Sequence, residues 1–452
     1  MAFAEHTDRK ELLETGRGLR RLVGRCELAT HHRRPGQVAV DLVQAGNFDR
    51  VPDLVPLRLA RMAMGPFAFM RGAAAVMAHD LAAAPGAHGL DVQICGDAHL
   101  SNFGLFASPE GRQVMDLNDF DETLVGPFDY DLKRLCASIV VVARESSMSE
   151  DAAANAVVDG VHAYRGMTKA LSRMPVHQQW AVGFNPRLLK KVRVSDLEKV
   201  LARVAQKARS NDSVRASEKM TVPDPDDWRF KDAPPILRRL DGVERDQVSA
   251  SLTGYWESVA ASKQVLLSRY EVADLAFRVV GVGSVGTRAY IALLHGSNDD
   301  PFVLQIKEAR PSVYATDPRC QVPGAGHDGH RVVHGQQIMQ TYSDPMLGWT
   351  QIAGRPFMVR TFRNLKGSID PSLLGPHQLD DYARICAALM ARAHARSLDP
   401  HLLRGYLGKA NKLAEAMVSY ARAYADQTEA DYEAFLAAIK RGAITIADDP
   451  LR

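Results

Sequence analysis

The sequence predicts an α+β protein in which a small strand-rich segment interrupts a mainly helical chain. Apolar residues recur at three- and four-residue spacing through 130–172, 195–209 and 245–268, which is typical of amphipathic helices. From about residue 269 to 364 the apolar runs are shorter and are separated by turn residues, which favours strands. Helical spacing returns from 377 onward. The 452 residues allow about two to four compact units.

We expect four segments along the chain. Residues 1–90 form an N-terminal helical segment, and residues 91–268 form a helical lobe with a polar loop and a hairpin. Residues 269–364 form a small antiparallel β lobe. Residues 365–452 form C-terminal helices that return to the helical lobe.

Turn residues and apolar patterns give more detail within these segments. Gly65 and Pro66 interrupt the helical pattern near the N-terminus, and separate helices are expected at 409–425 and 428–440. The runs LAFRVVG, TRAYIALL and FVLQIKEA predict an antiparallel meander. A helix at about 329–342 and two more strands complete the expected β lobe.

The composition excludes several classes of protein. Hydrophobic residues make up 46% and charged residues 24% of the chain, as in globular proteins rather than disordered or collagen-like chains. The formal net charge of +3 indicates neither a nucleic-acid partner nor a membrane partner. The five cysteines lie far apart without a CxxC pair, so we expect a reducing, cytoplasmic compartment. Nothing in the sequence indicates an oligomeric state.

The segment ICGDAHLSNFGLF holds the strongest chemical signal. Asn102 follows Asp97 by five positions, which is the spacing of D-x-x-x-x-N in the catalytic loop of protein kinases. The next residues predict a β-hairpin that returns Asp116 beside Asn102, giving two oxygen ligands for Mg²⁺. Asp97 is then free to orient or deprotonate an attacking hydroxyl. The alternative is an ordinary loop, because Asp and Asn are common in turns.

Acidic residues are concentrated at the exit of this hairpin. Asp116, Asp119, Asp121 and Glu122 lie within seven residues of one another. So many like charges repel one another unless a cation or basic side chains intervene. The acidic exit therefore favours the functional interpretation of the loop.

A glycine-rich string and a lysine form the second candidate site. Gly281, Gly283 and Gly286, with Ser284 among them, precede a strand rather than the helix that a Rossmann turn requires. We interpret the string as a hairpin tip that folds over phosphates. Lys307 follows Gly286 by 21 positions, which is enough for one strand out and one back beneath the tip. A structural hairpin and a solvated lysine are the alternative.

These motifs resemble those of the kinase-like phosphotransferases, in particular the aminoglycoside and choline kinase branch. CGDAHLSNFGLF followed by VMDLND is similar to their catalytic loop and metal-binding strand. PFAFMRG, NDFDE, GVGSVGTR, LQIKEA and RAHARS also resemble signatures of the bacterial domain of unknown function 2252 family, over about residues 55–440.

The resemblance implies roles for individual residues, with ATP and Mg²⁺ as cofactors. Asp97 is implied as catalytic base, and His99 of the same motif is placed with it. The implied metal ligands are Asn102 and Asp116, and we place Asp119 with them. The implied nucleotide contacts are Gly281, Gly283, Ser284, Gly286 and Lys307.

The sequence departs from the kinase pattern in three respects. The glycine string follows the catalytic loop, so a two-lobe kinase-like fold would have to be circularly permuted. Cys95 stands where a histidine often precedes the Gly-Asp pair. The helix expected to supply a glutamate to the lysine offers only His334 and Gln337, and the nearest acids are Glu308 and Asp328.

The sequence thus predicts an ATP-dependent phosphotransferase that acts on a hydroxyl of an unidentified small molecule. Lys307 and Asp116 are then expected on opposite walls of one pocket between the lobes. One alternative is a pseudokinase or nucleotide-sensing scaffold, and another is a metal-dependent hydrolase that uses Asp97, His99, Asp116 and Asp119. Arg71 of PFAFMRG is interpreted as a buried anchor, with contact to a substrate anion as the alternative.

Overall fold

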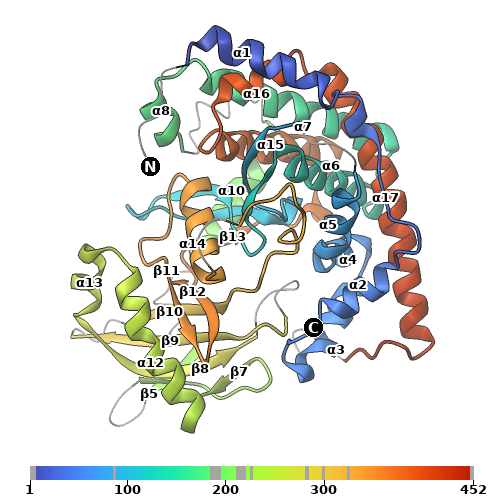
Figure 1. Cartoon of the computed structure of the whole chain (residues 1–452). Coiled ribbons are helices and arrows are strands. Elements are labelled where there is room, and N and C mark those ends of the chain that lie inside the picture. Colours follow the sequence, from blue (N-terminus) through green and yellow to red (C-terminus); the bar gives the residue numbers. More distant parts are fainter. Residues whose placement is uncertain are drawn as a thin grey trace.

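Helices fill one half of the protein and a twisted antiparallel sheet fills the other (Figure 1). This arrangement confirms the α+β class. The described part of the computed structural model comprises residues 7–84, 88–183, 195–209, 220–223, 228–279, 285–297, 301–322 and 326–447. Each half has its own hydrophobic core. The polar loops of the candidate site lie where the halves meet.

Four long helices form the frame of the helical half. They are α6 (Phe128–Glu145), α7 (Glu150–Leu171), α15 (Pro376–His394) and α17 (Asn411–Lys440). Nearly every residue of α6 is buried, so this helix is enclosed on all sides by apolar contacts. The pattern over 130–172 predicts helix throughout but divides into α6 and α7. The division follows from Ser147 at φ 56° and from Ser149, whose Oγ caps α7.

The last helix differs from the expected pair at 409–425 and 428–440. α17 runs unbroken for 30 residues. The stretch contains neither glycine nor proline, and the Thr428 hydroxyl donates to the carbonyl of Tyr424 without breaking the backbone ladder.

Shorter helices surround this frame. α3 and α4 are separate, as expected, because Gly65 is extended and Pro66 starts the next helix. The shorter helices are α1 (Arg9–Gly18), α2 (Ala39–Ala45), α3 (Val55–Met62), α4 (Pro66–Gly72), α5 (Ala74–Ala82), α8 (Val176–Ala181), α10 (Glu198–Ala208) and α16 (Pro400–Leu407).

The sheet half contains the expected meander. Its strand order is β11-β12-β10-β9-β8-β7, and every neighbouring pair is antiparallel. The strands are β7 (Leu237–Arg239), β8 (Tyr270–Arg278), β9 (Ala289–Gly296), β10 (Pro301–Glu308), β11 (Gly348–Ile352) and β12 (Arg355–Thr361). Three helices accompany the sheet, namely α12 (Gly242–Ser258), α13 (Ala261–Leu267) and α14 (Asp328–Met339).

The sheet half begins earlier in the chain than residue 269. β7 forms its edge, and Val248 and Tyr255 of α12 belong to the core of the sheet. The amphipathic pattern over 245–268 predicts the helices correctly, but periodicity alone does not show which core an apolar face covers.

Short strand pairs hold the polar loops. β1 (Asp91–Ile94) pairs with β4 (Leu124–Pro127), and β2 (Phe103–Ala107) forms the expected hairpin with β3 (Gln113–Leu117). The hairpin gains a third strand, β13 (Gly367–Ser368). A further pair consists of β5 (Thr221–Pro223) and β6 (Trp228–Phe230). The loop after β1 and the exit of β3 are thereby brought side by side.

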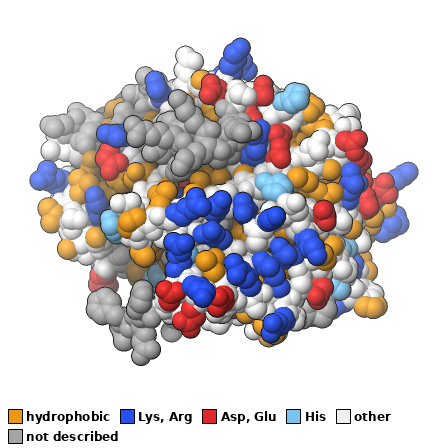
Figure 2. Space-filling view, turned by 90° about the horizontal axis from the view of Figure 1, so that it is seen from above, with side chains coloured by type: hydrophobic (Ala, Val, Ile, Leu, Met, Phe, Trp, Pro, Cys, Tyr) orange, Lys and Arg blue, Asp and Glu red, His pale blue; other side chains and the backbone are white. Residues whose placement is uncertain are grey.

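The positive charge of the surface is unevenly distributed. Lys and Arg side chains gather on the face seen from above, over α1, α7 and α16 (Figure 2). Burial, followed by the charges of Arg173, Arg9, Arg165 and Arg17, lowers the pKa of Arg404 in this region. A strongly basic face therefore exists despite the small net charge. No helix within the described ranges is long and apolar enough to cross a membrane.

Candidate active site

A polar cavity of about 340 Å³ lies between the two halves. Several distant parts of the chain line it. The N-terminal helices contribute Arg58 and Arg71, the loop after β1 contributes Asp97, and the exit of β3 contributes Asp119. The chain beyond β10 adds Arg310. The cavity is therefore lined by both acidic and basic side chains.

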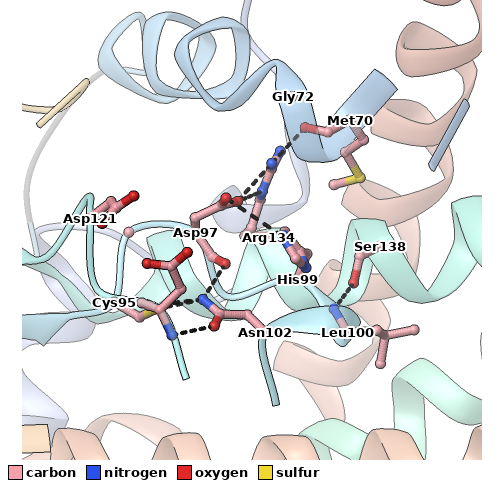
Figure 3. A network of polar contacts seen from close by, with 12 residues as sticks. Met70, Gly72, Cys95, Asp97, His99, Leu100, Asn102, Asp121, Arg134 and Ser138 are labelled. Atoms are coloured by element: carbon pink, nitrogen blue, oxygen red, sulfur yellow. Dashed lines mark hydrogen bonds and ion pairs between the residues drawn. The ribbon is translucent and has the colours of Figure 1, made fainter. Parts of the chain in front are cut away.

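Asp97 lies at the centre of the catalytic-loop motif and is held by an arginine. Arg134 of α6 donates from Nε to Asp97 Oδ1 over 2.8 Å, and its Nη2 lies 2.7 Å from the same oxygen. The Arg134 side chain is 1% exposed and that of Asp97 is 23% exposed. Figure 3 shows the two side chains facing each other. Asp97 is thus an oriented carboxylate with access to the cavity.

His99 lies beside Asp97 and is buried. Its Nε2 is 3.6 Å from Asp97 Oδ2, and its ring packs edge-on against Phe67. Burial lowers the pKa of His99 to about 4, because the surroundings disfavour the charged ring. His99 is therefore neutral at physiological pH. Its Nδ1 has no hydrogen-bond partner among the described residues.

One face of α6 fixes the whole loop. The carboxylate of Asp131 accepts the backbone N–H groups of Cys95 and Gly96 over 2.7 and 2.8 Å. Ser138 Oγ accepts the N–H of Leu100 (Figure 3). Arg134 lies between Asp131 and Ser138 along α6. The signal was present in the sequence as polar residues at i, i+3 and i+7 of an apolar helix, but the site prediction missed it.

Asn102 joins the catalytic loop to the exit of β3. Its Oδ1 accepts the backbone N–H of Asp119 over 2.8 Å, and its Nδ2 donates to the carbonyls of Asp97 and Asp119. Cys95, at the position often held by histidine, donates from Sγ to the Asp119 carbonyl. The predicted proximity of the loop and hairpin exit is therefore observed, with Asp119 as the acid beside Asn102.

Lys307 reaches this exit from the sheet half. Its Nζ lies 2.5 Å from Asp121 Oδ2 and 3.4 Å from Asp119 Oδ1. Burial alone would lower the pKa of Lys307, but the two carboxylates raise it. Burial would likewise raise the pKa of Asp119, and nearby cations, Lys307 foremost, hold it below its usual value. The pair therefore stays charged.

Two further cations lie on the same side of the cavity. Arg360 of β12 and Lys366, which precedes β13, both line it and both act on the charge of Asp119. Burial, followed by the charge of Arg360, lowers the pKa of Lys366 to about 7. Together with Lys307, these residues form a cationic group around Asp119.

Asp116 is not part of this arrangement, which corrects the expectation that it faces Lys307 across the pocket. Its side chain is 5% exposed and lies 2.5 Å from Arg392 Nη2. Neither Asp116 nor Lys307 is among the described lining residues, whereas Asp119 and Asp121 are. Successive residues of a strand point to opposite faces, and Asp116 of β3 points into the helical half. The acid opposite Lys307 is Asp119.

The glycine string is described only in part. Gly281, Gly283 and Ser284 lie outside the described residues. Gly286 adopts φ +86°, which favours glycine, and its carbonyl accepts the N–H of Val51 over 2.7 Å. The end of the string therefore packs against the N-terminal helical segment.

The acids considered as partners of Lys307 lie elsewhere. Glu308 points to the other face of β10 and pairs with Arg288 and Arg355 over 3.3 and 3.2 Å. Asp328 pairs with Arg331 on α14. Asp121 therefore holds the lysine in place of a helix glutamate.

The donor set fits Mg²⁺ with few protein ligands. Asp119 is a half-exposed carboxylate kept ionised by its neighbours, and the Asn102 carbonyl oxygen has a second lone pair beyond its bond to Asp119. Mg²⁺ commonly takes one or two carboxylates and completes its shell with phosphate oxygens and water. Within the described ranges, no group of three or more His, Cys, Asp and Glu side chains has a metal-holding arrangement. The four residues of the hydrolase alternative are not brought together, because Asp116 is separate.

One protein family matches most of the chain. Its description is "Uncharacterized protein conserved in bacteria (DUF2252)", and its model covers residues 50–438. The chain belongs to this family. All cavity residues named above, from Arg58 to Lys366, lie within the DUF2252 match, and its range agrees with the one expected from the motifs. No curated protein and no solved structure matches the chain.

Proposed function

We propose that this DUF2252 protein is an ATP-dependent phosphotransferase that transfers the γ-phosphoryl group to a hydroxyl of a small molecule. The observation that carries the proposal is the contact of Lys307 with Asp119 and Asp121. Lys307 and Asp119 are 188 residues apart in sequence and belong to the two separate motifs. Protein kinases likewise bring a lysine of a strand and an acid that follows the catalytic loop into one site for phosphoryl transfer.

The chain order supports a circularly permuted, kinase-like arrangement within this proposal. The loop with Asp97 and Asn102 precedes the sheet with Lys307, and α15 to α17 then return to the helical half. Lys307 pairs with Asp121 rather than with an acid of α14, so another carboxylate takes the place of the helix glutamate of the kinase pattern. Asp121 would keep the lysine extended toward the phosphates of a bound nucleotide.

Asp97 would bind the acceptor hydroxyl and take its proton. Arg134 fixes the carboxylate through Oδ1, and Oδ2 is left to face the cavity beside neutral His99. Orienting the hydroxyl would be the main task of Asp97, because phosphoryl transfer has a loose transition state in which orienting the nucleophile matters more than removing its proton early.

Asn102 and Asp119 would hold the metal, which when bound supplies charge neutralisation for the nucleotide phosphates. Lys307, Arg360 and Lys366 would bind the phosphate oxygens from the same side. All three side chains act on the charge of Asp119. The positive group is therefore already present where the negative charge of a triphosphate would arrive.

Nucleotide binding and transfer can be tested separately. The melting temperature of the full chain should rise with ATP plus Mg²⁺ and rise less with ATP plus EDTA, because the metal links Asp119 to the phosphates. Loss of γ-phosphate from ATP should then increase when a hydroxyl-bearing acceptor pool is added. Nucleotide binding without any transfer would support the pseudokinase alternative instead. Absence of any nucleotide effect would refute both.

A further inference from the structure

Three arginines meet at one end of the cavity. Arg50 follows α2, Arg58 lies on α3, and Arg310 lies just beyond β10. All three line the cavity, and Arg58 is 3% exposed. Side chains from two distant parts of the chain therefore place three guanidinium groups together.

The hydrogen bonds of these arginines all go to neutral groups. Arg58 donates to Asn47 Oδ1 over 2.7 Å and to the Gly72 carbonyl over 2.5 Å. The side-chain bonds of Arg50 and Arg310 go to backbone carbonyls, namely those of Gly46, Phe48 and Val285. No ion pair to a carboxylate is seen for these arginines among the described residues.

The cluster is therefore a site of positive charge without a directly paired carboxylate in the described structure, although Glu122, Asp121 and Glu308 of the same cavity act on the charge of Arg50. Burial lowers the pKa of Arg58, and among the described residues the charges of Arg50 and Arg310 add to this effect. Burial, followed by Arg310, lowers the pKa of Arg50 to about 10. Arg58 Nε is buried without a hydrogen-bond partner in the described structure. Like charges gathered in a desolvated cavity are costly unless an anion joins them.

Arg71 extends this positive region toward Asp97. It lies on α4 one position before Gly72, whose carbonyl Arg58 holds, and its guanidinium lies 5.9 Å from the centre of the Phe67 ring. Its Nε is buried and makes no hydrogen bond within the described ranges. Burial lowers the pKa of Arg71, and Asp97 opposes this effect more strongly than Asp370 and Asp119 do. The guanidinium is thus available beside the proposed base.

We propose that Arg50, Arg58, Arg310 and Arg71 bind an anionic group, a phosphate or a carboxylate, on the phosphoryl acceptor. This inference rests on the proposed function and names the substrate class for the same site. The planar donors of arginine suit both anions, because two parallel N–H groups match two oxygens. The acceptor is then a small molecule with one anionic end and one hydroxyl, the hydroxyl being placed at Asp97.

The position of the cluster separates it from the proposed nucleotide contacts. Lys307, Arg360 and Lys366 act on the charge of Asp119. Arg58 is affected by Arg50 and Arg310, and Arg71 is affected first by Asp97 and only then by Asp370 and Asp119. A triphosphate held at Asp119 would leave the arginine cluster for the second substrate. We therefore expect phosphate to raise the melting temperature by a similar amount with and without bound nucleotide.

The test uses inorganic phosphate and acetate as probes of the full chain. We expect phosphate or acetate to raise the melting temperature in a concentration-dependent manner, both alone and with a saturating non-hydrolysable ATP analogue plus Mg²⁺. Arg71→Ala should weaken the apparent affinity for the anion at least tenfold and leave the nucleotide shift unchanged. Within the described part of the chain the Arg71 side chain has no hydrogen-bond partner that its loss would leave unpaired, so the variant should fold.

Two further variants complete the experiment. Arg58→Gln removes the charge from the centre of the cluster and should abolish the anion effect if the variant folds. Arg112→Ala is the matched control, because Arg112 is exposed in the β2–β3 turn and does not line the cavity. It should leave the anion effect unchanged.

Three outcomes would overturn the inference. The first is that neither phosphate nor acetate shifts the melting temperature of wild type. The second is that Arg71→Ala responds to the anion as wild type does. The third is that phosphate competes with the ATP analogue. Competition would assign the arginines to the nucleotide phosphates. An anion shift in a protein that no nucleotide stabilises would instead refute the proposed function and leave the anion site supported.

Discussion

The ammonium of Lys307 lies 2.5 Å from Asp121 Oδ2, although 186 residues separate the two in sequence. This contact joins the sheet to the exit of the catalytic hairpin. It places a buried lysine against Asp119 and Asp121, which line the same polar cavity as Asp97. The following predictions test the role of each part.

Asp97→Asn should reduce transfer by about 10²- to 10⁴-fold, the usual contribution of a general base. The amide oxygen still accepts from Arg134, so the loop should keep its position. Nucleotide affinity should stay within a few-fold of wild type, because Asp97 faces the acceptor. Paired measurements of turnover and of the nucleotide dissociation constant check this. Equal losses in both would show that Asp97 has a different role.

Asp119→Asn should remove most of the Mg²⁺-dependent part of nucleotide binding. The substitution keeps the size of the side chain but removes the charge that faces Lys307 and the metal. Titration of ATP with Mg²⁺ and with EDTA gives the comparison. In the variant the two curves should nearly coincide. A variant that keeps the full metal effect would place the metal elsewhere.

Asp116→Ala should lower the free energy of unfolding without lowering the affinity for nucleotide. The side chain of Arg392 is 2% exposed, and removing its carboxylate partner leaves a buried charge unpaired. Breaking such a pair costs about 3–5 kcal/mol. Denaturant unfolding measures the loss. At temperatures where the variant remains folded, its nucleotide affinity should match that of wild type, and a selective loss of nucleotide binding would restore Asp116 to the metal site.

The pH dependence of stability should report on Glu122. Burial raises its pKa from 4.5 to about 7, against the Val313 N–H and Arg331, while Asp121 adds to the rise. The folded chain therefore binds this proton more tightly than the unfolded chain. The contribution to stability is complete below about pH 4.5 and is lost as the pH rises through about 7.

Glu122→Gln should remove this pH-dependent loss. The amide oxygen can still accept the Val313 N–H that Glu122 Oε2 accepts over 2.7 Å. Between about pH 4.5 and 7, the melting temperature of wild type should therefore fall relative to that of the variant. Parallel profiles for the two proteins would show that the carboxyl titrates normally.

Local patterns were sufficient to predict much of the fold. The hairpin from Phe103, the strand with Lys307 and the break at Gly65 and Pro66 each depend on neighbouring residues, and the structure contains all three. The prediction of two helices at 409–425 and 428–440 was wrong, because α17 continues through the residues between them. β7 belongs to the sheet because it pairs with β8, which lies about 30 residues further along the chain. Local periodicity does not show such pairing.

The candidate site was predictable as a loop and a lysine, but not in its electrostatics. Asp116 of β3 points toward Arg392, whereas Asp119 lies beyond the end of β3 and points toward Lys307, and the spacing of the two acids alone does not show this. The arginines of the N-terminal helices and the role of Arg134 arise from tertiary packing. Such contacts join segments that are far apart in the chain, and no pattern in either segment predicts that they meet.

Titration calorimetry of ATP with Mg²⁺ into the full chain, with Lys307→Met as the matched variant, tests the central claim most directly. The account predicts saturable binding to wild type that depends on Mg²⁺. It predicts at least tenfold weaker binding to Lys307→Met, because the variant lacks the cation between Asp119, Asp121 and the phosphates. Absence of binding to wild type, or equal binding to both proteins, would contradict the account.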